Sequence, residues 1–427
     1  MSSASPVFRI GVVSDVQAYP HEGDWGLSNL RKALKMLAER KIDLLLMAGD
    51  LADAAEAVPG CAEWWRKLVA EAFPEGAVRV ILCDGNHDRW RHTDRDDRAA
   101  FPDFCRAFAI PADNPRHDRV RGYDFFTIST EDIASYGETA LAELDRRIGE
   151  AKKRAPGKPI FVMSHFPPAD TMAGSGKGSI GLRAVLNRHP EVVSLSGHTH
   201  HPLEDEQSIW QGEFTAVTTA TLSYGCIHGP VRYENCAGPI VPFAREALGI
   251  LVLEVRPDML EVRRFHVADD REIAPERRWR WSLPYRAADA PYAPDRRRKN
   301  AVPPAFPDGA QLLIRYDYGF AYFAVDAARH PDCVISYRLN LAEVADDGST
   351  TPVGDVHYVA DFYRQERHRA ERQFFRLPGR LLRPGKRYRF QVYPAETFGL
   401  EGAPLTLVAR IPEFYGFRPA PEPLPQE

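Results

Sequence analysis

The stretch that decides the fold is Val80-Ile81-Leu82-Cys83-Asp84-Gly85-Asn86-His87-Asp88, an apolar run that ends in a glycine and three polar residues. A short, continuous apolar run is typical of a strand covered on both faces. Because open α/β sheets bind ligands at the carboxyl ends of their strands, such a strand would deliver Asn86, His87 and Asp88 to a functional edge. A lone Gly-Asn-His is also common in turns with a solvated imidazole, so the interpretation depends on the rest of the chain.

Four other apolar runs in the first half of the chain end in the same way. They are residues 8–14 before Asp15-Val16-Gln17, 42–48 before Gly49-Asp50, 160–164 before His165, and 192–196 before Gly197-His198-Thr199-His200. Carboxylate, carboxamide and imidazole groups bind hard or borderline divalent metals. The five strand ends together therefore predict a metal site at the edge of a sheet.

The 427-residue chain is too long for one ordinary domain, and its pattern of apolar and polar residues changes along its length. Apolar runs alternate with helix-period segments from residue 7 to about 200, which predicts a layered α/β domain, and a hairpin at 249–267 would complete its sheets. From residue 308 onward about seven short strands, several of period two, predict a β-sandwich. The segment between these two domains is rich in proline, which is typical of a linker. We therefore expect domains at 1–290 and 308–427 and a linker at 291–307.

Composition and charge argue against several classes of function. The formal net charge of -4 and pI near 6.4 give no global attraction to nucleic acid or membranes. A nuclease remains a weaker alternative because of the basic run 296–299, which is more typical of a solvated linker. No segment approaches the roughly 18 uninterrupted apolar residues of a membrane helix. The six scattered cysteines and the absence of a leader-like N-terminus predict a reduced, cytoplasmic protein without thiolate metal sites.

The five polar blocks resemble those of the calcineurin-like metallophosphoesterases in order and spacing, over roughly residues 7–202. The blocks are Asp15-x-Gln17, Gly49-Asp50-x-x-Asp53, Gly85-Asn86-His87-Asp88, Ser164-His165 and Gly197-His198-Thr199-His200. The resemblance implies a four-layer α/β/β/α sandwich. The pattern around Pro384-Gly385 to Gly399 resembles a fibronectin type III or related immunoglobulin-like module. It implies a smaller all-β sandwich that serves as a spacer or contacts a protein or glycan.

The resemblance further implies a binuclear metal site. One metal would be held by Asp15, Gln17, Asp50 and His200, and Asp50 would bridge to a second metal held by Asn86, His165 and His198. His87 would be the outer-sphere acid or phosphate contact, with Asp88 or another carboxylate orienting its ring. Gln17 stands where the family usually has histidine. Because a carboxamide is a harder and weaker donor than imidazole, manganese is favoured over zinc, and iron or zinc remain alternatives.

The resulting functional expectation is a phosphohydrolase with two divalent metals. It would cleave phosphodiester or nucleotide pyrophosphate bonds with a metal-activated hydroxide, and its substrate would be a phosphate-ester small molecule or a nucleotide. Glutamine at this position also occurs in relatives resembling manganese-dependent ADP-ribose or CDP-alcohol pyrophosphatases. Two alternatives stay open: a phosphomonoesterase or protein phosphatase using the same site, and a scaffold whose metal site is vestigial.

Overall fold

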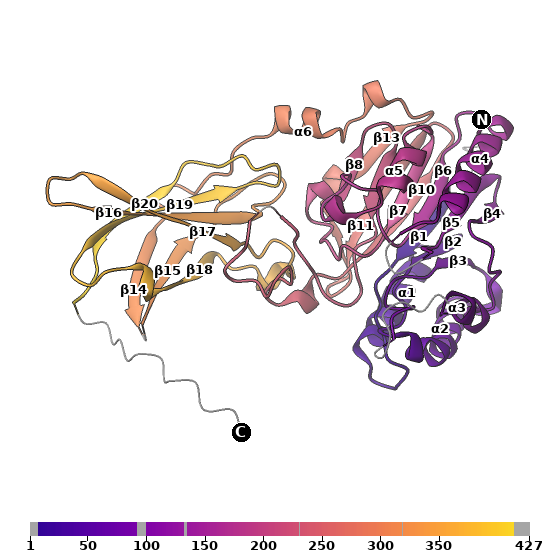
Figure 1. Ribbon diagram of the computed structural model, residues 1–427, viewed down its shortest axis with the longest axis horizontal. Helices are drawn as coiled ribbons and strands as arrows, with labels where there is room; N and C mark the ends of the chain where they lie inside the picture. The colour runs from indigo at the N-terminus through magenta and orange to yellow at the C-terminus, as the bar shows by residue number, and fades with distance from the viewer. Residues whose placement is uncertain (1–6, 92–99, 132–134, 230, 318, 414–427) are drawn as a thin grey trace. The chain divides into compact units, whose positions relative to one another are not determined.

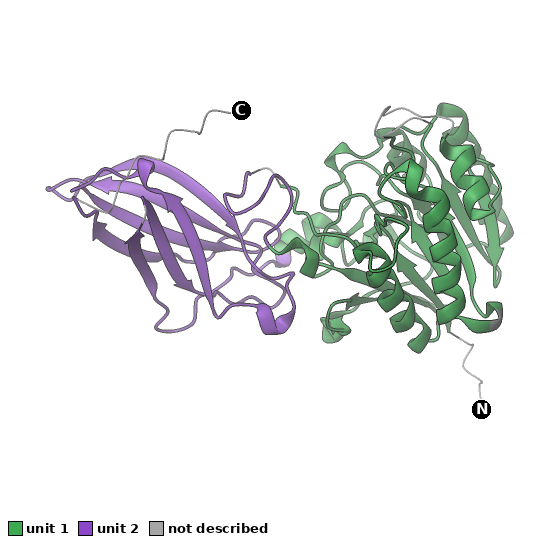
Figure 2. Ribbon diagram, turned by 90° about the horizontal axis from the view of Figure 1, so that it is seen from below, with its two compact units in different colours: residues 1–229, 243–299 green, residues 230–242, 300–427 purple. Residues whose placement is uncertain are grey.

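The computed structural model describes residues 7–91, 100–131, 135–229, 231–317 and 319–413. The chain divides into two compact units, residues 1–229 with 243–299 and residues 230–242 with 300–427 (Figure 2). The segment before Phe243 joins the second unit because Asn235 exchanges two hydrogen bonds of 2.9 Å with the Val359 backbone. The Tyr363 hydroxyl also donates to the Pro242 carbonyl at 2.6 Å. The domain bounds expected at 290 and 308 stay a prediction.

Unit 1 is built on two mixed sheets (Figure 1). The first sheet has the order β12-β11-β10-β1-β2-β3, with β13 also paired to β11. β1, β2 and β3 are parallel, and the predicted hairpin is confirmed as the antiparallel pair β10 and β11. The bounds are β1 Phe8–Val13, β2 Leu44–Ala48, β3 Arg79–Cys83, β10 Gly249–Val255, β11 Met259–His266, β12 Arg271–Ile273 and β13 Trp279–Ser282.

The second sheet of unit 1 has the order β4-β5-β6-β7-β9-β8. β5, β6, β7 and β9 are parallel neighbours. The bounds are β4 Arg116–Val120, β5 Tyr123–Ile128, β6 Ile160–Ser164, β7 Val192–Ser196, β8 Ile209–Gln211 and β9 Thr215–Thr218. The α-helices are α1 Trp25–Glu39, α2 Val58–Ala72, α3 Ala100–Phe108, α4 Glu138–Arg154, α5 Ile180–Leu186 and α6 Pro294–Asn300.

Short 3-10 helices connect these elements. They are η1 Ala55–Ala57, η2 Pro74–Gly76, η3 Ser175–Lys177, η4 Glu206–Ser208, η5 Ala244–Glu246, η6 Pro275–Arg277 and η7 Ala287–Asp289 in unit 1, and η8 Glu366–His368 and η9 Gly379–Leu381 in unit 2. In the part of the chain that the structure describes, no helix is long and apolar enough to cross a membrane.

Separate apolar cores lie between the layers of unit 1. Successive strand residues face opposite sides of a sheet, so neighbouring residues of β1 belong to different cores. Val12 packs in the core between the two sheets, together with Phe161 of β6. Val13 instead packs with Leu34 of α1 on the outer face of the first sheet.

The outer face of the second sheet has its own core. Val162 of β6 belongs to it, together with Leu144 and Ile148 of α4, and all three side chains are fully buried. Helices therefore cover the outer face of each sheet, while the inner faces pack against each other. The predicted four-layer α/β/β/α sandwich is confirmed.

Unit 2 consists of two antiparallel sheets, β14-β15-β18 and β17-β16-β19-β20. Burial alternates along β15, β18 and β19, as period-two strands require. Phe323 of β15 meets Phe390 of β19 with 5.0 Å between ring centroids, so the two sheets enclose one aromatic core. The predicted all-β sandwich is confirmed. The bounds are β14 Leu312–Asp317, β15 Phe320–Asp326, β16 Ser336–Val344, β17 Thr350–Val359, β18 Arg372–Pro378, β19 Arg387–Ala395 and β20 Leu405–Arg410.

The basic run 296–299 is mostly exposed, as its composition predicts, and Arg297 is the exception. The run lies on the short helix α6, and Arg297 donates to Glu206 at 2.7 Å. The same buried carboxylate accepts from Arg264 at 2.8 Å and from the Trp279 indole at 2.9 Å. Composition predicts exposure only on average, and here a buried acid supplies a partner for one of the arginines.

We expect Glu206→Gln to lower the free energy of unfolding of unit 1 by about 3–5 kcal/mol at pH 7, because it leaves buried guanidinium charge without a counter-ion. Burial opposes ionisation of Glu206, but Arg264 and Arg297 outweigh it and hold its pKa below the usual 4.5. This stabilisation is therefore present above about pH 4.5 and is lost as the pH falls through the lower folded pKa. Urea unfolding at several pH values measures it.

The matched control is Glu143→Gln, which changes a partly exposed carboxylate paired with Arg146 and Arg147. We expect that variant to unfold almost as the unmodified protein does, since exposed ion pairs contribute little. A difference between wild type and Glu206→Gln that stays constant from pH 7 to about pH 3.5 would contradict the assignment.

Candidate metal centre

The polar residues that follow five strands of unit 1 meet in one place. The turns after β1 and β2 are joined by backbone hydrogen bonds from Asp15 to Gly49 (3.0 Å) and from Gln17 to Asp50 (2.9 Å). The turn after β7, in the other sheet, reaches them because the His198 N–H donates to both Asp15 carboxylate oxygens at 3.1 and 3.2 Å. The carboxyl ends of both sheets therefore build one site.

Five of the seven predicted ligands have left-handed backbone conformations. Non-glycine residues rarely adopt a positive φ, and each such residue costs on the order of 1 kcal/mol or more. The φ values are 52° at Asp15, 45° at Gln17, 53° at Asp50, 69° at His198 and 50° at His200. Strain of this kind concentrates at functional sites, where the surrounding structure holds the backbone in place.

One group of side chains surrounds the first predicted metal position. The His200 Nε2 atom lies 3.1 Å from Asp15 Oδ1. The Gln17 amide nitrogen lies 3.3 Å from His200 Nε2 and 3.4 Å from Asp50 Oδ2. Asp15 and Asp50 are almost completely buried. Four predicted ligands thus face one another within hydrogen-bonding distance.

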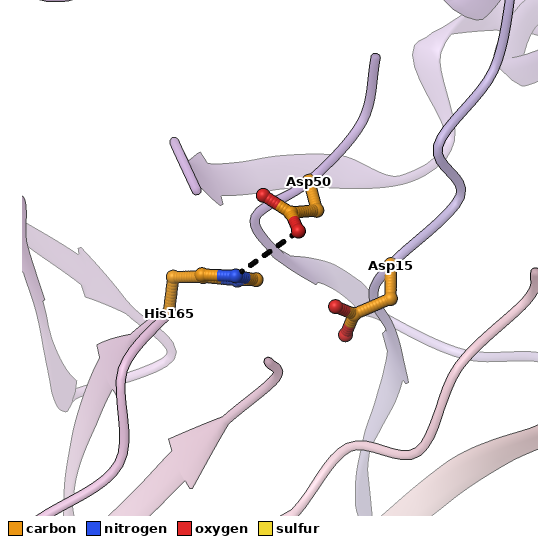
Figure 3. Close-up of side chains that lie close together, drawn as sticks. All are labelled: Asp15, Asp50 and His165. Atoms are coloured by element: carbon orange, nitrogen blue, oxygen red, sulfur yellow. Dashed lines mark ion pairs between the residues drawn. The ribbon is translucent and has the colours of Figure 1, made fainter. Parts of the chain in front are cut away.

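A second group shares Asp50. His165 Nε2 lies 3.3 Å from Asp50 Oδ2, the ion pair drawn in Figure 3, and 3.1 Å from Asn86 Oδ1. The same Asn86 oxygen lies 3.0 Å from His198 Nδ1. Ligand atoms of Asp15, Asp50 and His165 all lie within 4.8 Å of one another. The contacts divide the seven residues into two groups that meet at Asp50.

Backbone carbonyls orient two of the imidazoles. His165 Nδ1 lies 2.9 Å from the Ala48 carbonyl, and His200 Nδ1 lies 2.8 Å from the Tyr224 carbonyl. Because a carbonyl only accepts, Nδ1 is the donor in each of these contacts, and Nε2 is the ring nitrogen that faces the centre. Metal-binding histidines are commonly held in this way.

The electrostatics of the centre fit bound cations. Burial opposes ionisation of Asp50, but His165 and His87 outweigh it and hold the pKa of Asp50 well below its usual range. Burial likewise opposes protonation of His165, yet Asp50 raises its pKa to about 10. Burial, followed by the charge of His165, lowers the pKa of His198 to about 4. Two buried carboxylates among nitrogen and amide donors are a donor set suited to divalent metals.

Gln17 would fit this donor set after a rotation of its side-chain amide. Its nitrogen faces the centre, and its Oε1 accepts from the Ser223 hydroxyl at 3.2 Å. A carboxamide binds metal through oxygen, so ligation requires a half-turn of the amide. The Ser223 hydroxyl can both donate and accept, and it would then accept from the amide nitrogen.

His87 lies at the rim of the centre, and Asp53 holds its ring. His87 Nδ1 lies 2.9 Å from the Asp53 carbonyl and 3.5 Å from its carboxylate. Burial opposes protonation, but Asp53 and Asp50 raise the pKa of His87 to about 9. The Asp53 carboxylate also hydrogen-bonds to the Tyr19 phenol. Sequence reasoning gave Asp53 no role, although its place in the second block was a signal.

Asp88 makes different contacts. Its carboxylate accepts from the backbone N–H groups of Gly85 (2.9 Å), Ala52 (2.8 Å) and Leu51 (3.2 Å). Burial and then the charge of Asp50 raise its pKa to about 7. Asp88 therefore ties the turn after β3 to the turn after β2. Its catalytic role stays a prediction, and the carboxylate beside the His87 ring is that of Asp53.

We expect Gly85→Ala to reduce metal binding, because a Cβ atom there would overlap the carboxylate and backbone nitrogen of Asp50. Metal content after reconstitution with Mn²⁺, measured by elemental analysis, should fall from about two ions per chain to below about one. Gly149→Ala in α4, where the added Cβ meets nothing within 4 Å, is the matched control. Full metal content in Gly85→Ala would show that the close approach to Asp50 is dispensable.

Several known proteins are similar to this chain. The family model of the calcineurin-like phosphoesterases matches residues 8–202. A dimetal phosphatase from Danio rerio is similar at 13% identity, covering 63% of this chain and 99% of its own, with a TM-score of 0.43. Purple acid phosphatase PPD1 from yellow lupin is similar at 15% identity, covering 65% and 54%, with a TM-score of 0.46.

The C-terminal region matches the third fibronectin III domain of the human KIAA0343 protein at 16% identity, covering 27% of this chain and 87% of that domain, with a TM-score of 0.20. No curated protein matches the chain. The matched family and the buried cluster of Asp15, Asp50 and His165 lead to one conclusion. Residues 8–202 form a calcineurin-like phosphoesterase domain, the domain of a family of phosphoric ester hydrolases.

Proposed function

We propose that this protein is a phosphodiesterase or nucleotide pyrophosphatase that uses two divalent metals. The observation that supports the proposal is the convergence of seven donor side chains in two groups that share Asp50, with His87 beside them. The proposed ligands are Asp15, Gln17, Asp50, Asn86, His165, His198 and His200.

The charge of this donor set favours an anionic substrate. Asp15 and Asp50 are the carboxylates among the proposed ligands, so two divalent cations would leave a net positive centre. When bound, the cations withdraw charge from phosphate oxygens and acidify the attacking water. The donor side chains would hold the cations, and Asp50, which is almost completely buried, would be shared by the two groups.

His87 supplies the proton that the leaving group needs. Asp53 fixes the ring and favours its protonated form at neutral pH. An alkoxide that leaves from a diester is a strong base, so proton donation by a positioned histidine lowers the barrier to its departure.

Manganese and a cytoplasmic location belong to the same proposal. The oxygen donors of Gln17 and Asn86 support manganese over zinc. The six cysteines, none of which forms a disulfide, are compatible with a reducing compartment.

We expect Mn²⁺-loaded protein to hydrolyse bis-p-nitrophenyl phosphate faster than p-nitrophenyl phosphate. His87→Ala should lower kcat/KM for the diester by about 10²–10³-fold, because it removes a positioned donor to the reacting phosphate but leaves the proposed ligands. Release of p-nitrophenol measures both rates. A faster monoester reaction would favour a phosphomonoesterase, and metal uptake without any hydrolysis would favour the scaffold.

We expect Gln17→His to raise the affinity for Zn²⁺ by about tenfold or more, because imidazole is a stronger donor to zinc than a carboxamide. Competition with a chromogenic chelator measures the affinity for Zn²⁺ and Mn²⁺ side by side. Gln17→Ala, which removes the donor, should weaken both. Unchanged affinities in both variants would show that Gln17 is not a ligand.

A further inference from the structure

Trp25 is an exposed aromatic residue tied to the candidate metal centre. It is the first residue of α1 and is 41% exposed. Its indole N–H donates to the Ser223 carbonyl at 3.2 Å, and the Ser223 hydroxyl donates to Gln17 Oε1 at 3.2 Å. Contacts through one residue, Ser223, therefore connect the indole to a proposed ligand.

The surroundings hold the indole in a fixed position. The Asp24 carboxylate caps α1 by accepting from the Leu27 N–H at 2.9 Å. One turn further on, the Asn29 side chain donates to the Leu222 carbonyl at 2.8 Å. The first turns of α1 are thus attached to the same segment that Trp25 contacts. A ring that is already ordered loses little conformational entropy when a ligand stacks on it.

Arg245 adds positive charge beside the ring. It belongs to η5, which is held by a 2.9 Å hydrogen bond from the Gly225 N–H to the Ala244 carbonyl. Its guanidinium carbon lies 5.2 Å from the centroid of the Trp25 ring. This cation–π pair gives an aromatic surface that also attracts anions.

We propose that Trp25 is the stacking platform for the base of a nucleotide substrate, with Arg245 beside it. The inference rests on the phosphodiesterase function proposed above and names its substrate class, a phosphoester of a nucleoside. Every nucleobase offers a flat face to an aromatic ring, so this contact selects nucleotides over phosphoesters of aliphatic alcohols without choosing one base.

Trp25 could instead only hold residues 222–224 in place. Two substitutions separate these roles. Trp25→Phe keeps an aromatic face but loses the hydrogen bond to Ser223, whereas Trp25→Ala loses both. Trp64→Ala is the matched control, because Trp64 is a partly buried helical tryptophan that also carries a cation, Lys67, at 4.6 Å from its ring.

The experiment is calorimetric titration of the full-length, Mn²⁺-loaded protein with adenosine 5′-monophosphate and with ribose 5-phosphate, which lacks the base. We expect the nucleotide to bind about tenfold more tightly than the sugar phosphate. Trp25→Ala should abolish that preference and leave the affinity for ribose 5-phosphate unchanged. Trp25→Phe should keep most of the preference, and Trp64→Ala should keep all of it.

Three outcomes would overturn the inference. A wild-type protein that hydrolyses bis-p-nitrophenyl phosphate but binds both ligands equally would refute the platform and leave the proposed function intact. Equal weakening of both ligands by Trp25→Ala would assign Trp25 a purely structural role. A metal-loaded protein that neither binds these ligands nor hydrolyses the diester would refute the inference together with the proposed function.

Discussion

The constraint on which the site depends is the burial of two carboxylates, Asp15 and Asp50, at the junction of two sheets. Buried carboxylates are costly unless positive charge or hydrogen-bond donors surround them. Here the backbone N–H groups of His198 and His87 donate to them, and two further histidine rings face them. The groups that compensate the two buried carboxylates therefore include the nitrogen donors of the candidate metal centre.

The fold supplies this arrangement through its strand ends. Parallel strands in each sheet bring their carboxyl ends to one edge, and the turns there adopt left-handed conformations that redirect the side chains. Asp88 contributes by fixing two of these turns to each other through backbone N–H groups. The packed sheets beneath prevent these turns from relaxing. The turns therefore keep their strained backbone conformations and hold the side chains in position.

Near the centre, the segment 222–225 contacts two proposed ligands and the exposed indole of Trp25. Ser223 contacts both Gln17 and Trp25, and the Tyr224 carbonyl orients His200. A single loop thus positions one proposed ligand, orients another and holds the exposed indole. The chemistry of the metals and the choice of substrate would therefore share one structural support.

The sequence by itself determined the layered α/β domain, the β-sandwich and the set of candidate ligands. It did so because buried strands read as continuous apolar runs and half-buried strands as alternating ones, while the polar blocks stood at the strand ends. Only the tertiary structure decided that Asp53 holds His87, that Asp88 binds backbone N–H groups and that Arg297 pairs with Glu206. These contacts join residues whose separation or side-chain direction no local pattern encodes, since packing of distant segments decides which polar groups meet.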